Sequence, residues 1–338
     1  MSAYLCSQLK LSRSQLKKWY QHIWGIPIAR LTAHFNQADI SIFHQFRPAP
    51  TGGGHQFMRA LRDQFARMGL RVENNTISHT TRVCLFNSHN FDFDRLRQLR
   101  RAGCRMVHRV DGPIDVYRGQ DGGADRRIWQ INQELADTTI FQSNYSLQKH
   151  TELGLTFKSP SVIINAVDPQ IFHPGERISF DRHRKIRLIS SSWSDNPHKG
   201  GPIYKWIEEN LDWNRFEYTF VGRASEQFEH IHQIPPQPST QLANLLRQHD
   251  IYITASQHDP CSNALLEALS CGLPAIYLQS GGHPEIVGEA GLGFSDKEEI
   301  LMLLDALVNE YQKRQAQISL LSLSEVANRY LTVMEIQH

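Results

Sequence analysis

The chain has 338 residues, and its 36 lysines and arginines nearly balance its 34 aspartates and glutamates, for a net charge of +2 with histidine neutral. At about 150 residues per domain this length predicts two domains, and the balanced charge gives no overall argument for nucleic-acid binding. The chain lacks an apolar run long enough to span a membrane and begins without the apolar core of a secretion signal, so we expect a soluble cytoplasmic protein.

Residues 1–36 are expected to form an N-terminal extension that contains an amphipathic helix. Apolar residues recur at helical spacing from Leu16 to Trp24, and basic residues lie near the opposite side. Packing of this helix on the first domain is the favoured interpretation. The alternative is a membrane-surface or partner-docking element, which would make the protein peripheral at the inner membrane surface.

Strand-like and helix-like segments then alternate through a first domain at 37–173. We expect strands at 40–46, 82–86, 105–110, 138–142 and 161–165, with helical stretches between them. This alternation predicts a parallel, doubly wound α/β sheet covered by helices.

A polar, charge-rich linker at 174–185 leads into a second domain of the same kind, expected at 174–322. Its strands are expected at 186–191, 217–221, 250–254 and 274–278. A final helix in the segment 323–338 could pack on either domain, including back on the first. Two such domains predict a cleft faced by the carboxyl ends of the strands.

Metal sites and disulfides are not indicated. The five cysteines are scattered and odd in number, and His230 and His232 have no third ligand nearby. The sequence therefore predicts no metal and no disulfide framework.

Two glycine-containing segments suggest anion binding. The first, 50–54, follows the first strand, where glycines let backbone N–H groups approach an anion, although a glycine triplet alone more often marks a tight turn. The second begins after the strand at 250–254: Asp259 and Glu267 lie eight positions apart across a polar loop and a helix start, and Glu285 follows a further glycine pair. In this segment the N–H groups of Asn263 and Ala264 could meet phosphate, and Glu267 could accept from sugar hydroxyls.

The stretch from Asp259 to Glu285 resembles the donor-binding signature of retaining glycosyltransferases of family four, the glycosyl transferases group 1. This family has the GT-B fold, in which two Rossmann-like domains face a central cleft. Further elements match in order, over roughly residues 38 to 330: the glycine loop at 52–54, the segment 165–174, Lys199-Gly200 and Val221-Gly222.

The resemblance implies a role for each matching residue. Glu267 would hold the ribose hydroxyls of a nucleotide-diphosphate sugar, and Lys199 would pair with its diphosphate. The pyrophosphate would accept hydrogen bonds from the backbone N–H groups of Gly53, Gly54, Asn263 and Ala264. Glu285 would complete the donor site.

Three positions depart from the family pattern. Asp259 stands where the family usually has glutamate, near the transferred sugar. The usual arginine before Lys-Gly is missing, and Arg223 is the candidate replacement, with an ordinary surface role as the alternative. Asp111 ends the strand at 105–110, where the family often has histidine. We expect it in the cleft, with a structural cap or turn as the alternative.

The resemblance thus implies retaining transfer of a sugar from a UDP- or GDP-sugar to a hydroxyl acceptor, with Asp111 and Asp259 as catalytic candidates and no metal or other cofactor. The acceptor would be a glycan, glycolipid or small molecule, in cell-surface polysaccharide or glycoconjugate synthesis. Six arginines between Arg95 and Arg109 form either a solvated helix face or a site for an anionic acceptor or lipid. A non-catalytic module that binds nucleotide sugars in a GT-B cleft is the alternative.

Overall fold

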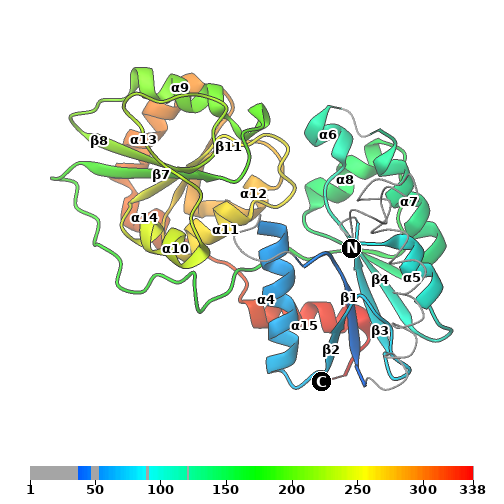
Figure 1. The fold of residues 1–338 in the computed structure, drawn as a ribbon. Helices are drawn as coiled ribbons and strands as arrows, with labels where there is room; N and C mark the ends of the chain where they lie inside the picture. The colour runs from blue at the N-terminus through cyan, green and yellow to red at the C-terminus, as the bar shows by residue number, and fades with distance from the viewer. Residues whose placement is uncertain (1–36, 47–52, 89–90, 120–121, 338) are drawn as a thin grey trace, which may run out of the picture.

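The computed structural model describes residues 37–46, 53–88, 91–119 and 122–337, and these form two α/β halves (Figure 1). The amphipathic helix expected before residue 36 lies outside the described residues. Among the helices of the described part, none is long and apolar enough to cross a membrane.

The first half contains a parallel sheet with the strand order β2-β1-β3-β4-β5-β6. Its central strands are buried from end to end and are mostly apolar, as expected where helices cover both faces of a parallel sheet. The strands are β1 (Ile40–Phe43), β2 (Val72–Asn74), β3 (Val83–Asn87), β4 (Arg105–Val110), β5 (Thr138–Phe141) and β6 (Pro160–Val162).

Within the described residues, five helices connect the strands of this sheet. The longest, α4, buries Phe57, Leu61 and Phe65 at a spacing of four residues, and the chain turns away at Gly69, whose φ is +85°. The helices are α4 (Gly53–Arg67), α5 (Phe93–Leu99), α6 (Ile114–Arg118), α7 (Ala124–Leu135) and α8 (Asn144–Glu152).

The second half contains a parallel sheet with the order β12-β11-β10-β7-β8-β9. Its strands are β7 (Ile186–Ser192), β8 (Phe216–Gly222), β9 (His232–Ile234), β10 (Ile251–Thr254), β11 (Ala275–Leu278) and β12 (Gly291–Phe294). Its helices are α9 (Gly201–Asn210), α10 (Ser239–Arg247), α11 (Asn263–Ser270), α12 (His283–Val287), α13 (Ile300–Asn309) and α14 (Tyr311–Ala316).

The last helix, α15 (Leu323–Met334), crosses back and packs on the first half, beside α4 (Figure 1). Its buried residues, among them Val326 and Tyr330, belong to the same apolar cluster as Ile40 and Phe57. A capping box between Ser322 and Glu325 starts the helix. Of the two placements left open by the sequence, the structure has the one on the first domain.

The expected central strands are all present, with ends that differ by a few residues. The strand expected at 40–46 ends at Phe43, and the one expected at 161–165 occupies 160–162. Three short strands were not expected from the sequence: β2 and β9 are three-residue strands with no buried residue, and β12 contains two glycines. All three lie at sheet edges, where a strong apolar pattern is not required.

Candidate functional site

A cavity of about 250 Å³ lies between the two halves, where the first turn of α4 meets the start of α11. The N–H groups in the first turn of an α-helix have no partner within the helix, so two helix N-terminal ends at one cavity favour an anion. The cavity is lined by Gly53, Ser191, Ser192, Trp193, Ser194, Lys199, Tyr204, Thr254, Ser256, Asp259, Cys261, Ser262, Asn263, Ala264 and Glu267.

Gly53 allows the close approach of the two helices. A Cβ atom placed on Gly53 would lie 2.4 Å from Cβ of Asn263, whereas one on Gly54 would meet nothing within 4 Å. Ser262 starts α11 by accepting a hydrogen bond from the Leu265 N–H. A side chain at position 53 would therefore push the two halves apart at the cavity.

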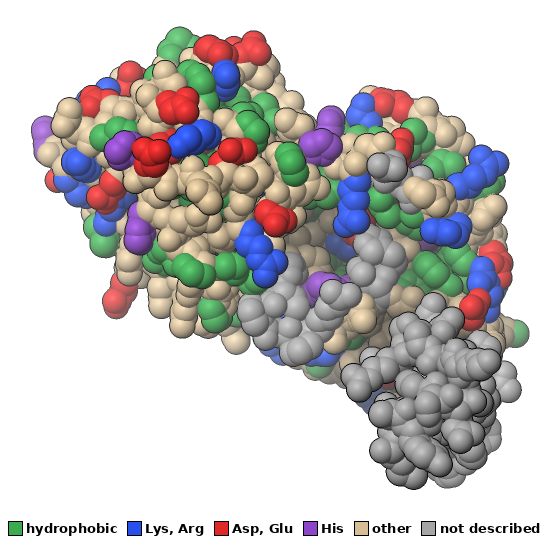
Figure 2. All heavy atoms as spheres, turned by 45° about the horizontal axis from the view of Figure 1, so that its top comes forward, with side chains coloured by type: hydrophobic (Ala, Val, Ile, Leu, Met, Phe, Trp, Pro, Cys, Tyr) green, Lys and Arg blue, Asp and Glu red, His purple; other side chains and the backbone are tan. Residues whose placement is uncertain are grey.

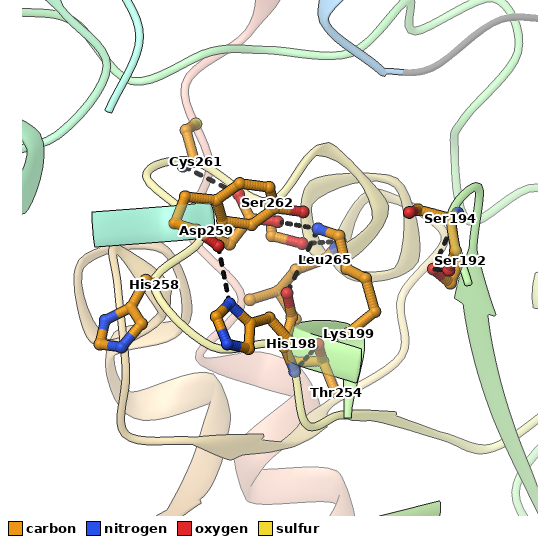
Figure 3. A network of polar contacts seen from close by, with 12 residues as sticks. Ser192, Ser194, His198, Lys199, Thr254, His258, Asp259, Cys261, Ser262 and Leu265 are labelled. Carbon is orange, nitrogen blue, oxygen red and sulfur yellow. Dashed lines mark hydrogen bonds and ion pairs between the residues drawn. The ribbon is translucent and has the colours of Figure 1, made fainter. Parts of the chain in front are cut away.

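Lys199 and Asp259 form an ion pair on the cavity wall (Figure 3). Lys199 Nζ lies 2.9 Å from Asp259 Oδ2 and 3.3 Å from Ser256 Oγ. Burial opposes the charge of Lys199, but the Asp259 carboxylate outweighs it and raises the pKa of the ammonium. Burial likewise opposes the charge of Asp259, and Lys199 reverses the effect and lowers the pKa of the carboxyl. Both groups are therefore charged at neutral pH.

The glycine pair before Glu285 supports the Asp259 loop. Gly282 N–H donates to the Asp259 carbonyl at 2.9 Å, and a Cβ atom on Gly281 would lie 2.2 Å from that same oxygen. Gly281 also has a φ of +66°, which glycine adopts without strain. The loop at Asp259 and the glycine pair, which lie at the two ends of the second glycine-containing segment, thus form one unit that fixes the position of Asp259.

Glu267, in the second turn of α11, is a buried carboxyl on the same wall, with 5% of its surface exposed. Among the described residues, no hydrogen bond to its carboxyl oxygens is found, and burial raises its pKa to about 8. Glu267 also lines a neighbouring cavity of about 340 Å³ beside α4. It is therefore placed to accept hydrogen bonds from hydroxyl groups of a ligand in either cavity.

Asp111, at the end of β4, belongs to a buried polar network of the first half. Its Oδ1 accepts a 2.8 Å hydrogen bond from Arg109 Nη1 and a further one from Gln142 Nε2. Arg109, which is 1% exposed, donates through Nη2 to Asn165 Oδ1 at 3.0 Å. Asn165 Nδ2 in turn donates to Asn263 Oδ1 at 3.1 Å, so the network continues to the first residue of α11.

His108 lies on the opposite side of β4 from Asp111, as the alternation of a strand predicts. It is fully buried, stacks on Phe86 with ring centroids 4.4 Å apart, and has its pKa lowered to about 3 by burial. His108 is therefore a neutral core residue. Asp111 directly follows the last residue of β4 and does not line the 250 Å³ cavity.

Three of the residues assigned to donor binding do not line the 250 Å³ cavity: Gly54, Arg223 and Glu285. Arg223 is exposed, and its backbone N–H donates to the Ser192 carbonyl. Glu285 joins the two halves instead, because its carboxylate accepts 2.8 Å hydrogen bonds from the backbone N–H groups of Asn144 and Tyr145 at the start of α8.

Two groups of residues near the cavity were not expected from the sequence. The first group is Trp193 with its serine neighbours: Ser191 and Ser192 end β7, and Ser194 follows Trp193. Their position at the carboxyl end of a central strand is the signal that could have found them. Arg109 and Gln142 are the other group. The sequence indicates a polar role for these two residues only through their expected burial in a parallel sheet. A single sequence does not show which buried polar residues face one another.

Comparison with known proteins gives three kinds of similarity. Residues 223–319 match the family Glycosyl transferases group 1. Sulfoquinovosyl transferase SQD2 of Arabidopsis thaliana is 23% identical in an alignment over 237 residues. The match covers 62% of this chain and 46% of that protein, so it spans less than half the length of this relative.

Two solved structures show the same fold at low identity. Sucrose-phosphate synthase from Thermosynechococcus elongatus has a TM-score of 0.64 at 13% identity, over 89% of this chain and 95% of that one. HepE of Anabaena, in complex with UDP and glucose, has a TM-score of 0.66 at 14% identity, over 88% of this chain and 100% of that one. The expected fold class, two Rossmann-like α/β domains in the GT-B arrangement, is confirmed.

Proposed function

The chain carries a glycosyl transferases group 1 domain in a GT-B fold, and from this premise we propose that it is a retaining glycosyltransferase that moves a sugar from a nucleotide-diphosphate sugar to a hydroxyl acceptor. One observation carries the proposal: the Lys199–Asp259 pair and the buried Glu267 share a cavity with the N-terminal ends of α4 and α11. The complexes of HepE with UDP and with UDP-glucose support a donor of this class.

The diphosphate is proposed to bind between the two helix ends. There the backbone N–H groups of Gly53, Asn263 and Ala264 and the Lys199 ammonium offer positive charge to it. The ribose hydroxyls donate to Glu267, and the transferred sugar extends toward Asp259. Gly54, Arg223 and Glu285 remain proposed donor contacts that require a change in the relative position of the two halves.

In the proposed reaction the bond from the sugar to the diphosphate breaks, and negative charge develops on the leaving oxygen. Lys199 and the N–H groups stabilise that charge, which is the largest contribution this site can make. The acceptor hydroxyl attacks on the same face of the sugar and gives its proton to the departing diphosphate. Asp111, held by Arg109, orients the sugar or acceptor hydroxyls. This route uses no protein nucleophile, metal ion or cofactor.

The competing hypothesis is a non-catalytic module that binds nucleotide sugars. It is favoured by Asp259 in place of glutamate, by Asp111 in place of histidine, and by the missing arginine before Lys199. Both hypotheses have the same donor site, but only the glycosyltransferase hypothesis expects turnover of the bound nucleotide sugar. We further propose a place in cell-surface polysaccharide or glycoconjugate synthesis, at the inner face of the membrane.

A thermal-shift series with UDP, GDP, ADP and their sugar conjugates tests the donor site, since a ligand that binds only the folded state raises Tm. We expect a selective rise with UDP or GDP, lost in Glu267→Ala. Slow release of free sugar from the bound conjugate without acceptor would then support the enzyme over the module. The absence of a shift with every nucleotide, or an equal shift in Glu267→Ala, would refute the assigned site.

A further inference from the structure

A second cavity, of about 850 Å³, lies in the first half at the carboxyl end of β1, between the segment leading into α5 and helix α7. Its lining combines aromatic, basic and acidic side chains: Phe43, His44, Gln45, Asn75, Phe91, Asp92, Phe93, Asp94, Arg95, Arg97, Arg127, Gln130 and Ile131. On the face shown in Figure 2, lysine and arginine side chains border the first domain's side of the hollow between the halves.

One wall of this cavity is aromatic. The rings of Phe91 and Phe93 pack edge to face with centroids 4.3 Å apart, and Phe91 is 6.0 Å from Phe43. Phe91 and Phe93 are only partly buried. The wall therefore offers apolar ring surface to a ligand.

The basic residues of the lining differ in whether their charge is already neutralised. Arg97 forms ion pairs with Asp94 at 3.0 Å and with Glu134 at 2.8 Å. The side chains of Arg95 and Arg127 make no ion pair or hydrogen bond with any residue in the described ranges, and Arg95 Nε is buried without a partner. Two guanidinium groups are therefore available for a ligand anion beside the aromatic wall.

This cavity is connected to the donor site through the start of α4. His44, which lines it, forms a 2.8 Å hydrogen bond through Nε2 to Nδ1 of His55. His55 lies two residues after Gly53, which lines the donor cavity. Both sites thus lie at the carboxyl edge of the first sheet, the edge at which ligands bind in open α/β folds.

We infer that the cavity binds the acceptor, and that this acceptor carries a phosphate or carboxylate group next to an apolar or ring face. The inference rests on the proposed glycosyltransferase function. Arg95 and Arg127 would hold the anion, because a guanidinium matches the geometry of both anions with paired N–H donors. Phe91 and Phe93 would contact the apolar face. The anion belongs either to a soluble sugar derivative or to a lipid headgroup.

Calorimetric titration of the full chain tests the inference without requiring turnover. Phenyl phosphate presents both features, while inorganic phosphate and phenol present one each, and all three are titrated with UDP present to fill the donor site. We expect phenyl phosphate to bind at least tenfold more tightly than either partial probe. Arg95→Gln and Arg127→Gln should each weaken it at least fivefold, whereas Arg329→Gln, an exposed arginine on α15, should not.

Vesicles distinguish the two sources of the anion. Binding to phosphatidylglycerol vesicles but not phosphatidylcholine vesicles, reduced by the same two substitutions, identifies a lipid headgroup, and binding of phenyl phosphate alone identifies a soluble acceptor. The inference is overturned if neither phenyl phosphate nor phosphatidylglycerol vesicles bind. It is also overturned if binding is unchanged in Arg95→Gln and Arg127→Gln. The UDP response of these variants should equal that of the parent, so a failed donor site is recognised separately.

Discussion

Replacing Glu267 by glutamine should make the protein more stable at high pH and change it much less at low pH. The carboxyl is 5% exposed and its pKa is raised to about 8 by burial. Glutamine has nearly the same shape as the protonated carboxyl and cannot ionise. The variant therefore isolates the free energy of holding this group in the folded protein.

The sign follows from proton binding. A glutamate with a pKa of 4.5 in the unfolded chain and about 8 in the folded one binds more protons when folded, so stability falls as pH rises between these values. For these pKa values, burial of Glu267 lowers the free energy of unfolding by roughly 1–2 kcal/mol at pH 5.5 and roughly 4–5 kcal/mol at pH 8.5. The stability advantage of the variant should thus grow by about 3 kcal/mol over this range.

Urea unfolding of both proteins at pH 5.5 and 8.5, followed by tryptophan fluorescence, measures this difference. All other groups titrate equally in the two proteins, so they cancel in the comparison. An advantage that changes by less than about 1 kcal/mol between the two pH values would show that Glu267 is already ionised or solvated in the free protein, and would refute the argument.

Three further predictions concern the donor cavity. Gly53→Ala should lower the free energy of unfolding by about 1–3 kcal/mol and weaken UDP binding, because its Cβ atom would clash with Asn263. Gly54→Ala should leave stability unchanged or raise it by up to about 1 kcal/mol. Equal Tm values for the two variants would contradict this. Lys199→Met should destabilise the fold by about 3 kcal/mol, because it leaves Asp259 unpaired. Adding Asp259→Asn should restore stability but not nucleotide binding. If the double variant is no more stable in urea than the single one, the ion pair does not explain the loss. UDP affinity measured by calorimetry should rise about threefold from pH 7.5 to 8.5, because Glu267 becomes ionised over this range. In Glu267→Gln the affinity should not change with pH. A parallel rise in both proteins would assign the effect to another group.

The sequence predicted the central strands well because several of them, such as β1, β3 and β10, are mostly apolar runs that are buried from end to end. The edge strands carry no such pattern: β2 reads Val-Glu-Asn and β9 reads His-Gln-Ile, and their backbone pairing depends on neighbours distant in the chain. The apolar face of α15 was evident, but an amphipathic face does not specify which of two cores it covers.

The residues of the candidate site likewise divide into those that local sequence places and those that it does not. Asp259, Asn263, Ala264 and Glu267 belong to one loop and helix, so local spacing was enough to place them on one cavity. Side-chain direction after a turn is harder to predict. Gly222 has a φ of +121° and ends β8, and the chain that leaves it carries the Arg223 side chain to an exposed position.

The return of α15 to the first half has a consequence for how the protein is made. The core of the first domain includes Leu323, Val326 and Tyr330, so it cannot be completed until the ribosome has synthesised the whole second domain. A fragment ending near residue 173 would expose the apolar surface that α15 covers. Such a fragment should require a chaperone or a separately supplied α15 peptide, and the two domains are therefore interdependent in biogenesis although each has its own sheet.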